Sequence, residues 1–264
     1  MAAQKFIRAT EYGPSDNALF EYALGLGDTA LVLGQRIAEW LGHAPSMELD
    51  IAASNFSLDL IGQAEQFLNY AGEVEGEGRS GDDLAFLRDG MFFRNHLIVE
   101  QPNRDWGVTM VRHFFLSTFL VHQYEGLSRS SDKQIAGISA KALKEMRYHQ
   151  RFSRDWIVRL AGGTEEGFKR IARGFDTLWR FTGELFENAD YEDALIKVGI
   201  AVDVSTLEAA WQDEVDTLLA QIGLDKPTAL QMITGRTLGH HTEHLGHMLC
   251  DMQFMQRAYP GASW

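Results

Sequence analysis

Residues 17–45, NALFEYALGLGDTALVLGQRIAEWLGHAP, decide the fold class of this chain. Their apolar side chains recur at steps of three and four residues, which places them on one face of a helix; they are Leu19, Ala23, Leu26, Ala30, Leu33, Ile37 and Trp40. Ser15 is a suitable N-cap before the pattern, and Gly42 and Pro45 end it. The stretch therefore predicts one long helix that faces a core.

The rest of the chain continues this helical pattern and shows no alternation typical of strands. We expect further helices at 47–71, 105–128, 132–160, 164–188 and 228–258, and one that starts at a capping-box pattern, Ser205 to Glu208. The connection after the second helix is the longest among the first four and holds a glycine-rich loop (73–83), a short turn and an extended piece (95–103). Ferritin-like bundles have one such long crossover. The sequence predicts an all-α, ferritin-like bundle in a single domain, 1–264, with four core helices at about 15–161 and extra C-terminal helices at about 164–258.

Composition excludes several classes of function. The 264 residues carry a net charge of −13, which disfavours a nucleic-acid binder and an anionic membrane surface. No stretch of about 18 apolar residues occurs, so no membrane span is expected. Cys250 is the one cysteine, so no intrachain disulfide can form, which suits the cytoplasm.

The core helices lack the metal-binding pattern of di-iron bundles. In those bundles two helices each give a Glu and two each give Glu-x-x-His, because residues three apart share a helix face. Here Met146 stands three residues before His149, although Glu145 lies four residues before it, and Leu60 precedes Gln63 at the same spacing. Leucine cannot bind a metal, and a thioether suits iron of this class poorly.

A second candidate for a metal site is the histidine-rich stretch near the C-terminus. If 228–258 is one helix, His240, His244 and His247 share a face and could bind zinc. One helix rarely completes a zinc site, so the alternative is a polar seam against another helix or a partner chain.

Several blocks of sequence resemble one known family across about 17–264. They are GDTALVLGQRIAEWLGHAP, DLIGQAEQFLNYAGE, LIVEQPN, ISAKALKEMRYHQRFSRDW, LWRFTGELF, GIAVD and HTEHLGHML. In these blocks the chain resembles the C subunits of phenylacetyl-CoA 1,2-epoxidase, the PaaC family. The resemblance implies a place in a bacterial monooxygenase that epoxidises phenylacetyl-CoA with dioxygen and NADPH. It also implies a catalytic A subunit of the same fold, which holds the iron and pairs with this chain as its scaffold.

The resemblance also implies where the iron ligands of the catalytic A subunit fall on this chain. The corresponding positions are Ala30, Leu60, Gln63, Ser117, Met146 and His149. Because only His149 keeps a ligand type, we expect no catalytic residue, no metal and no cofactor in this chain, with iron only in the partner. We expect an internal polar network in place of the metal, formed by Asp28, Asp59, Lys141, Lys144 and Glu145; for the two lysines an exposed helix face is the alternative.

Other functions remain open from the sequence. One is a ferritin-like oxidase that binds metal at unconventional spacing through Glu39, Asp59, Glu145 and His149. A ferritin-like storage protein would also need iron ligands. Self-association through an apolar face and contact with the coenzyme A tail of the substrate are further interactions that the sequence leaves open.

Overall fold

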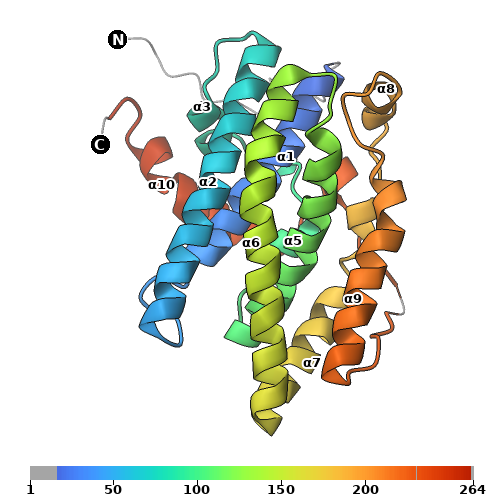
Figure 1. The fold of residues 1–264 in the computed structure, drawn as a ribbon. Coiled ribbons are helices and arrows are strands. Elements are labelled where there is room, and N and C mark those ends of the chain that lie inside the picture. Colours follow the sequence, from blue (N-terminus) through green and yellow to red (C-terminus); the bar gives the residue numbers. More distant parts are fainter. Residues whose placement is uncertain (1–16, 230, 263–264) are drawn as a thin grey trace.

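The computed structural model describes residues 17–229 and 231–262, and these residues form helices, turns and loops with no strand. Four long helices make a ferritin-like bundle (Figure 1): α1 (Ala18–Ala38), α2 (Met47–Glu75), α5 (Trp106–Leu127) and α6 (Lys133–Gly163). This confirms the predicted fold class. The proposed N-cap Ser15 lies outside the described residues, and the Asn17 side chain caps α1 by accepting from the Phe20 amide.

Helices α1 and α5 form the centre of the bundle because they are apolar on almost every side. Nearly every residue of both helices is buried, whereas α2 and α6 each bury one face. Small residues let α1 and α2 approach closely: a Cβ on Gly27 would lie 2.8 Å from the Leu68 side chain. The Ser57 hydroxyl donates to the Gly34 carbonyl (3.0 Å) across the same contact.

The crossover between α2 and α5 contains more helix than the sequence predicted. Residues expected to form a loop and an extended piece contribute α3 (Gly81–Phe86), the 3₁₀ turn η1 (Gly90–Phe92) and α4 (Leu97–Glu100). The Ser80 and Asp83 side chains form a capping box at the start of α3. These short elements fold back onto α1, which they could not do as an extended strand.

The C-terminal part is divided into shorter elements than predicted. The helix expected at 164–188 is α7 (Glu165–Trp179) followed by η2 (Gly183–Phe186), and α8 (Glu192–Lys197) was not predicted. The proposed capping box is wrong, because Asp203 caps η3 (Val204–Leu207), which leads directly into α9 (Glu208–Ile222). The chain then forms η4 (Arg236–Leu238) and α10 (Glu243–Ala258).

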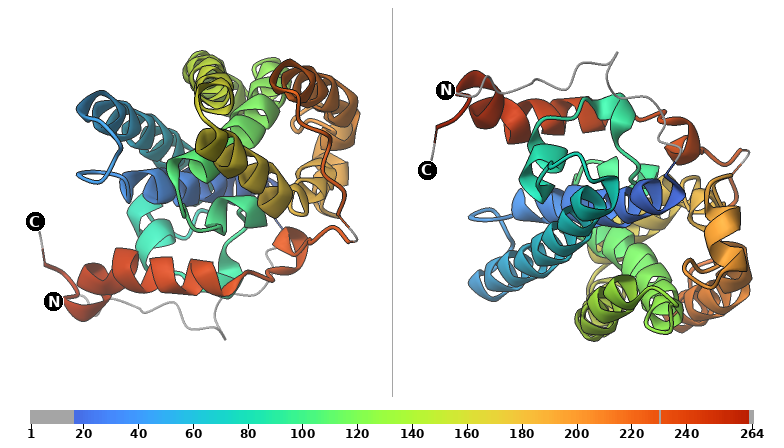
Figure 2. Two further views of the ribbon diagram at one scale, coloured as in Figure 1. Left: turned by 90° about the horizontal axis from the view of Figure 1, so that it is seen from below. Right: turned by 90° about the horizontal axis from the view of Figure 1, so that it is seen from above.

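Helix α10 packs on the crossover rather than on the four-helix bundle. The views in Figure 2 place it against α3 and η1, on the opposite side of α1 from α5 and α6. Two distant parts of the sequence, the crossover and the C-terminal segment, are therefore neighbours. Among the described helices, none is long and apolar enough to cross a membrane.

Candidate functional site

The six positions implied by the resemblance lie on the four bundle helices, and all are buried. Their exposed fractions are 2% or less, and they are Ala30 on α1, Leu60 and Gln63 on α2, Ser117 on α5, and Met146 and His149 on α6. The aliphatic and thioether side chains among them offer no oxygen donor. The Ser117 hydroxyl donates to the carbonyl of His113 in its own helix (2.6 Å).

Polar contacts cross the seam between α2 and α6. His149 Nε2 lies 3.1 Å from Asp59 Oδ2. One turn farther along, Gln63 Nε2 donates to Glu145 Oε2 (2.8 Å), and the Tyr124 hydroxyl donates to Gln63 Oε1 (3.3 Å). Burial lowers the pKa of His149, which the hydrogen bond to Asp59 partly opposes. The structure thus brings together Asp59, Gln63, Glu145 and His149.

His113 on α5 is the member of this seam that the sequence reasoning missed. Its ring packs against those of Phe56 (5.2 Å between centroids) and His149 (5.0 Å), and it is fully buried. Neither of its ring nitrogens has a hydrogen-bond partner among the described residues. Burial holds its pKa well below the ordinary value of 6.5, so the ring is neutral. Its position four residues before Ser117, on the same helix face, was the available signal.

Three residues expected in this network lie elsewhere. Lys141 and Lys144 are exposed, contrary to the expectation of an internal role, because the inward face of α6 passes through Ala142 and Met146. Asp28 is buried, but it pairs with Arg88 (Nη1 to Oδ2, 3.0 Å) and accepts from the backbone amide of Arg94 (2.8 Å). It therefore ties α1 to the crossover.

Glu39, a ligand in the oxidase alternative, also has separate partners. It lies at the C-terminal end of α1, and its carboxylate accepts from Arg36 and from the amide of Asn103 (2.9 Å). No hydrogen bond or ion pair of the described residues joins Glu39 to Asp59, Glu145 or His149.

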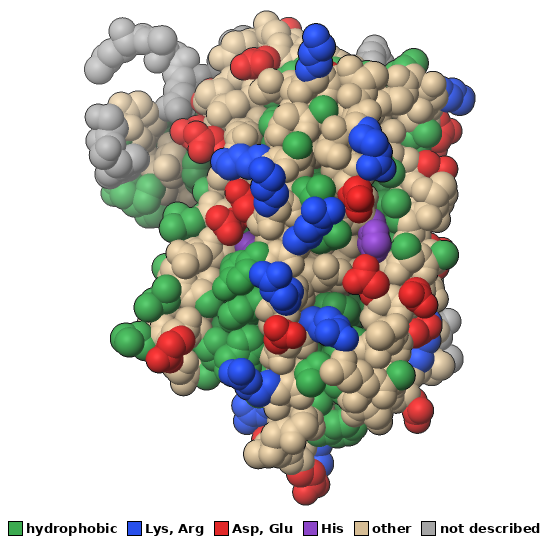
Figure 3. Space-filling view, viewed as in Figure 1, with side chains coloured by type: hydrophobic (Ala, Val, Ile, Leu, Met, Phe, Trp, Pro, Cys, Tyr) green, Lys and Arg blue, Asp and Glu red, His purple; other side chains and the backbone are tan. Residues whose placement is uncertain are grey.

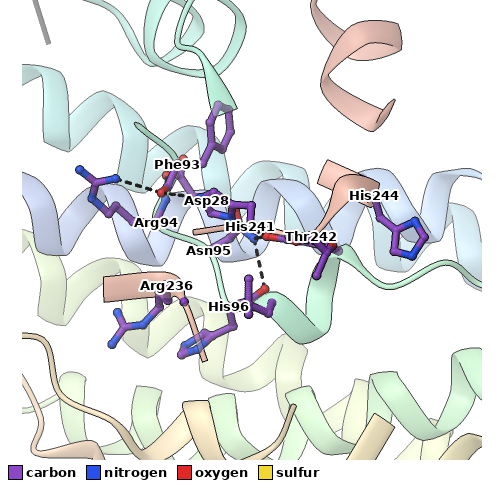
Figure 4. A network of polar contacts seen from close by, with 12 residues as sticks. Asp28, Phe93, Arg94, Asn95, His96, Arg236, His241, Thr242 and His244 are labelled. Carbon is purple, nitrogen blue, oxygen red and sulfur yellow. Dashed lines mark hydrogen bonds and ion pairs between the residues drawn. The ribbon is translucent and has the colours of Figure 1, made fainter. Parts of the chain in front are cut away.

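A second buried polar centre surrounds Glu100, at the end of α4 (Figure 4). Its Oε1 accepts from Asn95 (2.9 Å) and lies 2.6 Å from His241 Nδ1. Its Oε2 accepts from the backbone amide and the hydroxyl of Thr242 (2.8 and 2.6 Å). The Glu100 carbonyl accepts from Arg36. This centre fixes the segment before α10 against the crossover.

Glu184 joins the same two segments through backbone groups. It is fully buried, with Oε1 accepting from the amides of Gly235 and Arg236 (2.7 and 2.8 Å) and Oε2 from that of Leu97 (2.6 Å). Burial raises the pKa of this carboxyl, while the three amides act in the opposite direction. These contacts explain why 235–242 does not continue an α-helix, since the amides of Gly235 and Arg236 point at a side chain.

The predicted histidine face near the C-terminus is wrong. Helix α10 begins at Glu243, so His240 lies before the helix and does not share a face with His244 and His247. Within 17–229 and 231–262, no group of three or more His, Cys, Asp or Glu side chains is arranged to hold a metal ion.

Comparison with known proteins gives a family and a close relative. Residues 7–264 match the family described as "Phenylacetic acid catabolic protein". The chain is 48% identical to the protein of Escherichia coli (strain K12) that is named as the C subunit of 1,2-phenylacetyl-CoA epoxidase, over 248 residues that make up 94% of this chain and 100% of that protein. These matches confirm the resemblance seen in the sequence. The chain therefore belongs to the phenylacetic acid catabolic protein family.

Proposed function

We propose that this chain is a non-catalytic structural subunit of a phenylacetyl-CoA epoxidase in phenylacetate degradation. In this role it binds and stabilises a catalytic, di-iron A subunit of the same fold. It acts in the cytoplasm, a location that the single cysteine suits. The relative is named as one of several subunits of an epoxidase, which supports a function within an assembly of different chains.

The chemistry at the centre of the bundle is the observation that carries this proposal. Ala30, Leu60 and Met146 are buried where carboxylates would be needed. His149 is engaged with Asp59, and Gln63 with Glu145, so the donor set of these positions does not fit a pair of iron ions. Iron chemistry then belongs to the partner.

The surface for the partner is proposed to be the splayed end of α2 and α6. These helices are joined by contacts at Tyr70–Asp132, Gln63–Glu145 and Asp59–His149, and they diverge beyond this point (Figure 1). The diverging part carries large apolar side chains that are exposed or half-buried. They are here called the α2–α6 face: exposed Met47, Ile51, Leu58 and Tyr148, and half-buried Phe152 and Trp156. Apolar side chains gathered on one face are typical of protein interfaces.

The charge beside the α2–α6 face indicates which kind of partner surface it would bind. Helix α6 contains seven Lys and Arg residues against two acidic ones, although the whole chain has a net charge of −13. Figure 3 shows a line of Lys and Arg side chains that borders the apolar surface. Arg151 and Arg159 lie over the rings of Tyr148 and Trp156 (5.6 and 4.7 Å to the ring centroids). We therefore expect an acidic partner surface, and salt that weakens the complex.

The test is co-expression of this chain with the catalytic A subunit, followed by iron analysis and epoxidation of phenylacetyl-CoA. The proposal expects co-elution, iron in the complex but not in the isolated chain, and activity only in the complex. Stoichiometric iron and oxygen consumption by the isolated chain would instead support the oxidase alternative and overturn the proposal.

Matched variants test the α2–α6 face separately. Ile51→Glu with Leu58→Glu places charges at positions that are 54% and 68% exposed, and the control pair Val198→Glu with Leu238→Glu uses positions that are 61% and 72% exposed. The first pair is expected to abolish co-elution with the A subunit, and the control pair to retain it. Equal binding by both pairs would exclude this face while leaving the scaffold function intact.

A further inference from the structure

A small cavity lies where the C-terminal segment meets the central helices. Its volume is about 20 Å³, and its lining includes Tyr22 and Thr29 of α1, Gln123 of α5, His96 just before α4, and Arg236 of η4. A space of this size accommodates about one water molecule. The cavity is separate from the α2–α6 seam and has no part in the proposed scaffold function.

Three polar atoms that belong to residues of the cavity lining have no hydrogen-bond partner among the described residues. They are the Tyr22 hydroxyl, His96 Nδ1 and Arg236 Nε, and the three side chains are at most 6% exposed. The backbone of Val202 approaches the Tyr22 hydroxyl without well-formed hydrogen-bond geometry. Buried polar atoms in native proteins nearly always have a partner, which is often an ordered water. Three such atoms around one cavity point to a shared ligand.

The charges around the cavity favour a neutral ligand. The Arg236 guanidinium pairs with Glu192 (Nη1 to Oε1, 3.0 Å) and donates to the Glu187 carbonyl (2.9 Å), so its charge is already balanced. Burial and the charge of Arg236 keep the pKa of His96 well below 6.5, and burial raises the pKa of Tyr22. Both side chains are therefore uncharged at neutral pH, and the site does not attract an anion.

We infer that this cavity binds one ordered water molecule, which accepts a hydrogen bond from Arg236 Nε and bonds to the Tyr22 hydroxyl and His96 Nδ1. Figure 4 shows Arg236 beside His96. A water with three partners satisfies the usual requirement for a buried site. It links α1, the start of α4 and η4, so it fastens the C-terminal segment to the central helix.

A high-resolution crystal structure of the full chain, with a bromide soak, tests the site directly. The inference expects one density peak in the cavity, within hydrogen-bond distance of at least two of the three atoms and with no anomalous signal. A cavity without density would overturn it. An anomalous bromide peak would also overturn it, because it would identify an anion site.

Tyr22→Phe removes one partner of the water while keeping the ring. Tyr191→Phe is its matched control, because the Tyr191 hydroxyl is also buried without a partner among the described residues but does not line the cavity. The inference expects Tyr22→Phe to lower the melting temperature more than Tyr191→Phe and to displace the density peak. An equal shift in both variants, or a rise for Tyr22→Phe, would contradict it, since removing an unpartnered hydroxyl costs no hydrogen bond.

Discussion

His149 Nε2 on α6 lies 3.1 Å from Asp59 Oδ2 on α2, and this contact joins a fully buried imidazole to a carboxylate that is 37% exposed at the surface. The pair stands one turn from Gln63–Glu145, and α2 and α6 diverge toward one end of the bundle (Figure 1). The contact therefore closes the bundle core on the side of the α2–α6 face.

Removing the carboxylate of this pair should destabilise the chain. Asp59→Ala leaves His149 Nε2 without a partner in a buried place, and we expect a loss of about 1–2 kcal/mol in the free energy of unfolding. Asp59→Asn keeps an oxygen acceptor and should lose less. Urea unfolding of the wild type and both variants at pH 7.5 measures their order of stability. Equal losses in both variants would mean that the hydrogen bond contributes little.

The buried histidines should make the chain sensitive to acid. Burial lowers the pKa of His96, His113 and His149, so below their ordinary value of 6.5 the unfolded chain binds more protons than the native chain. Stability is then full above about pH 6.5 and falls as pH decreases, by about 1.4 kcal/mol per pH unit for each group that stays neutral.

His113→Met should flatten this dependence between pH 7 and pH 5, since it removes one titrating group and two unpartnered nitrogens at similar volume. The exposed His43 gives the control, and His43→Gln should leave the slope unchanged. Melting temperatures across this pH range provide the measurement. An unaltered slope in His113→Met would show that His113 does not titrate on unfolding.

Breaking the Asp28–Arg88 pair should have a much larger effect than breaking a surface pair. Both side chains are fully buried, so Asp28→Ala leaves the Arg88 guanidinium in the interior without its counter-ion and should cost about 3–5 kcal/mol. Glu166→Ala, which breaks an exposed i,i+4 pair with Arg170, should change stability far less. Chemical denaturation of both variants tests this, and a mild effect of Asp28→Ala would indicate that solvent reaches Arg88.

Glu184→Gln should loosen the C-terminal segment. An amide nitrogen in place of one carboxylate oxygen would face a backbone N–H, either that of Leu97 or those of Gly235 and Arg236. We expect faster hydrogen exchange in 95–101 and 234–242, with the bundle helices unaffected. Glu187→Gln is the control, because that side chain is exposed. Unchanged exchange would mean that other contacts suffice to hold the segment.

The four bundle helices could be predicted because their local sequence signals, the caps and the apolar periodicity, match the helix ends and the buried faces of the structure. The predicted helix starts at 105 and 132 coincide with capping aspartates, and each side chain accepts from a backbone amide at the start of its helix. The C-terminal helices were less predictable. The helical pattern at 228–258 is interrupted by contacts to Glu184 and Glu100, which are distant in sequence. Local patterns do not contain such tertiary hydrogen bonds.

The candidate site was predictable in its positions but not in all its members. His149 and Glu145 lie at the spacing that the sequence shows. His113 shares a helix face with Ser117, but its contact with His149 emerges only when α5 is placed against α6. The two lysines were misassigned because neighbouring positions on a helix differ by about 100°. Lys141 is thus exposed although Ala142 is buried.

The carboxylate of Glu100 has a consequence for the order in which the chain is made. Apart from Asn95, its side-chain partners are His241 and Thr242. A ribosome completes the four bundle segments, 18–163, before it reaches residues 241 and 242, so this acid lacks those partners until the last part of the chain is made. A chain that stops before residue 241 therefore leaves a carboxylate of the crossover without two of its three side-chain partners.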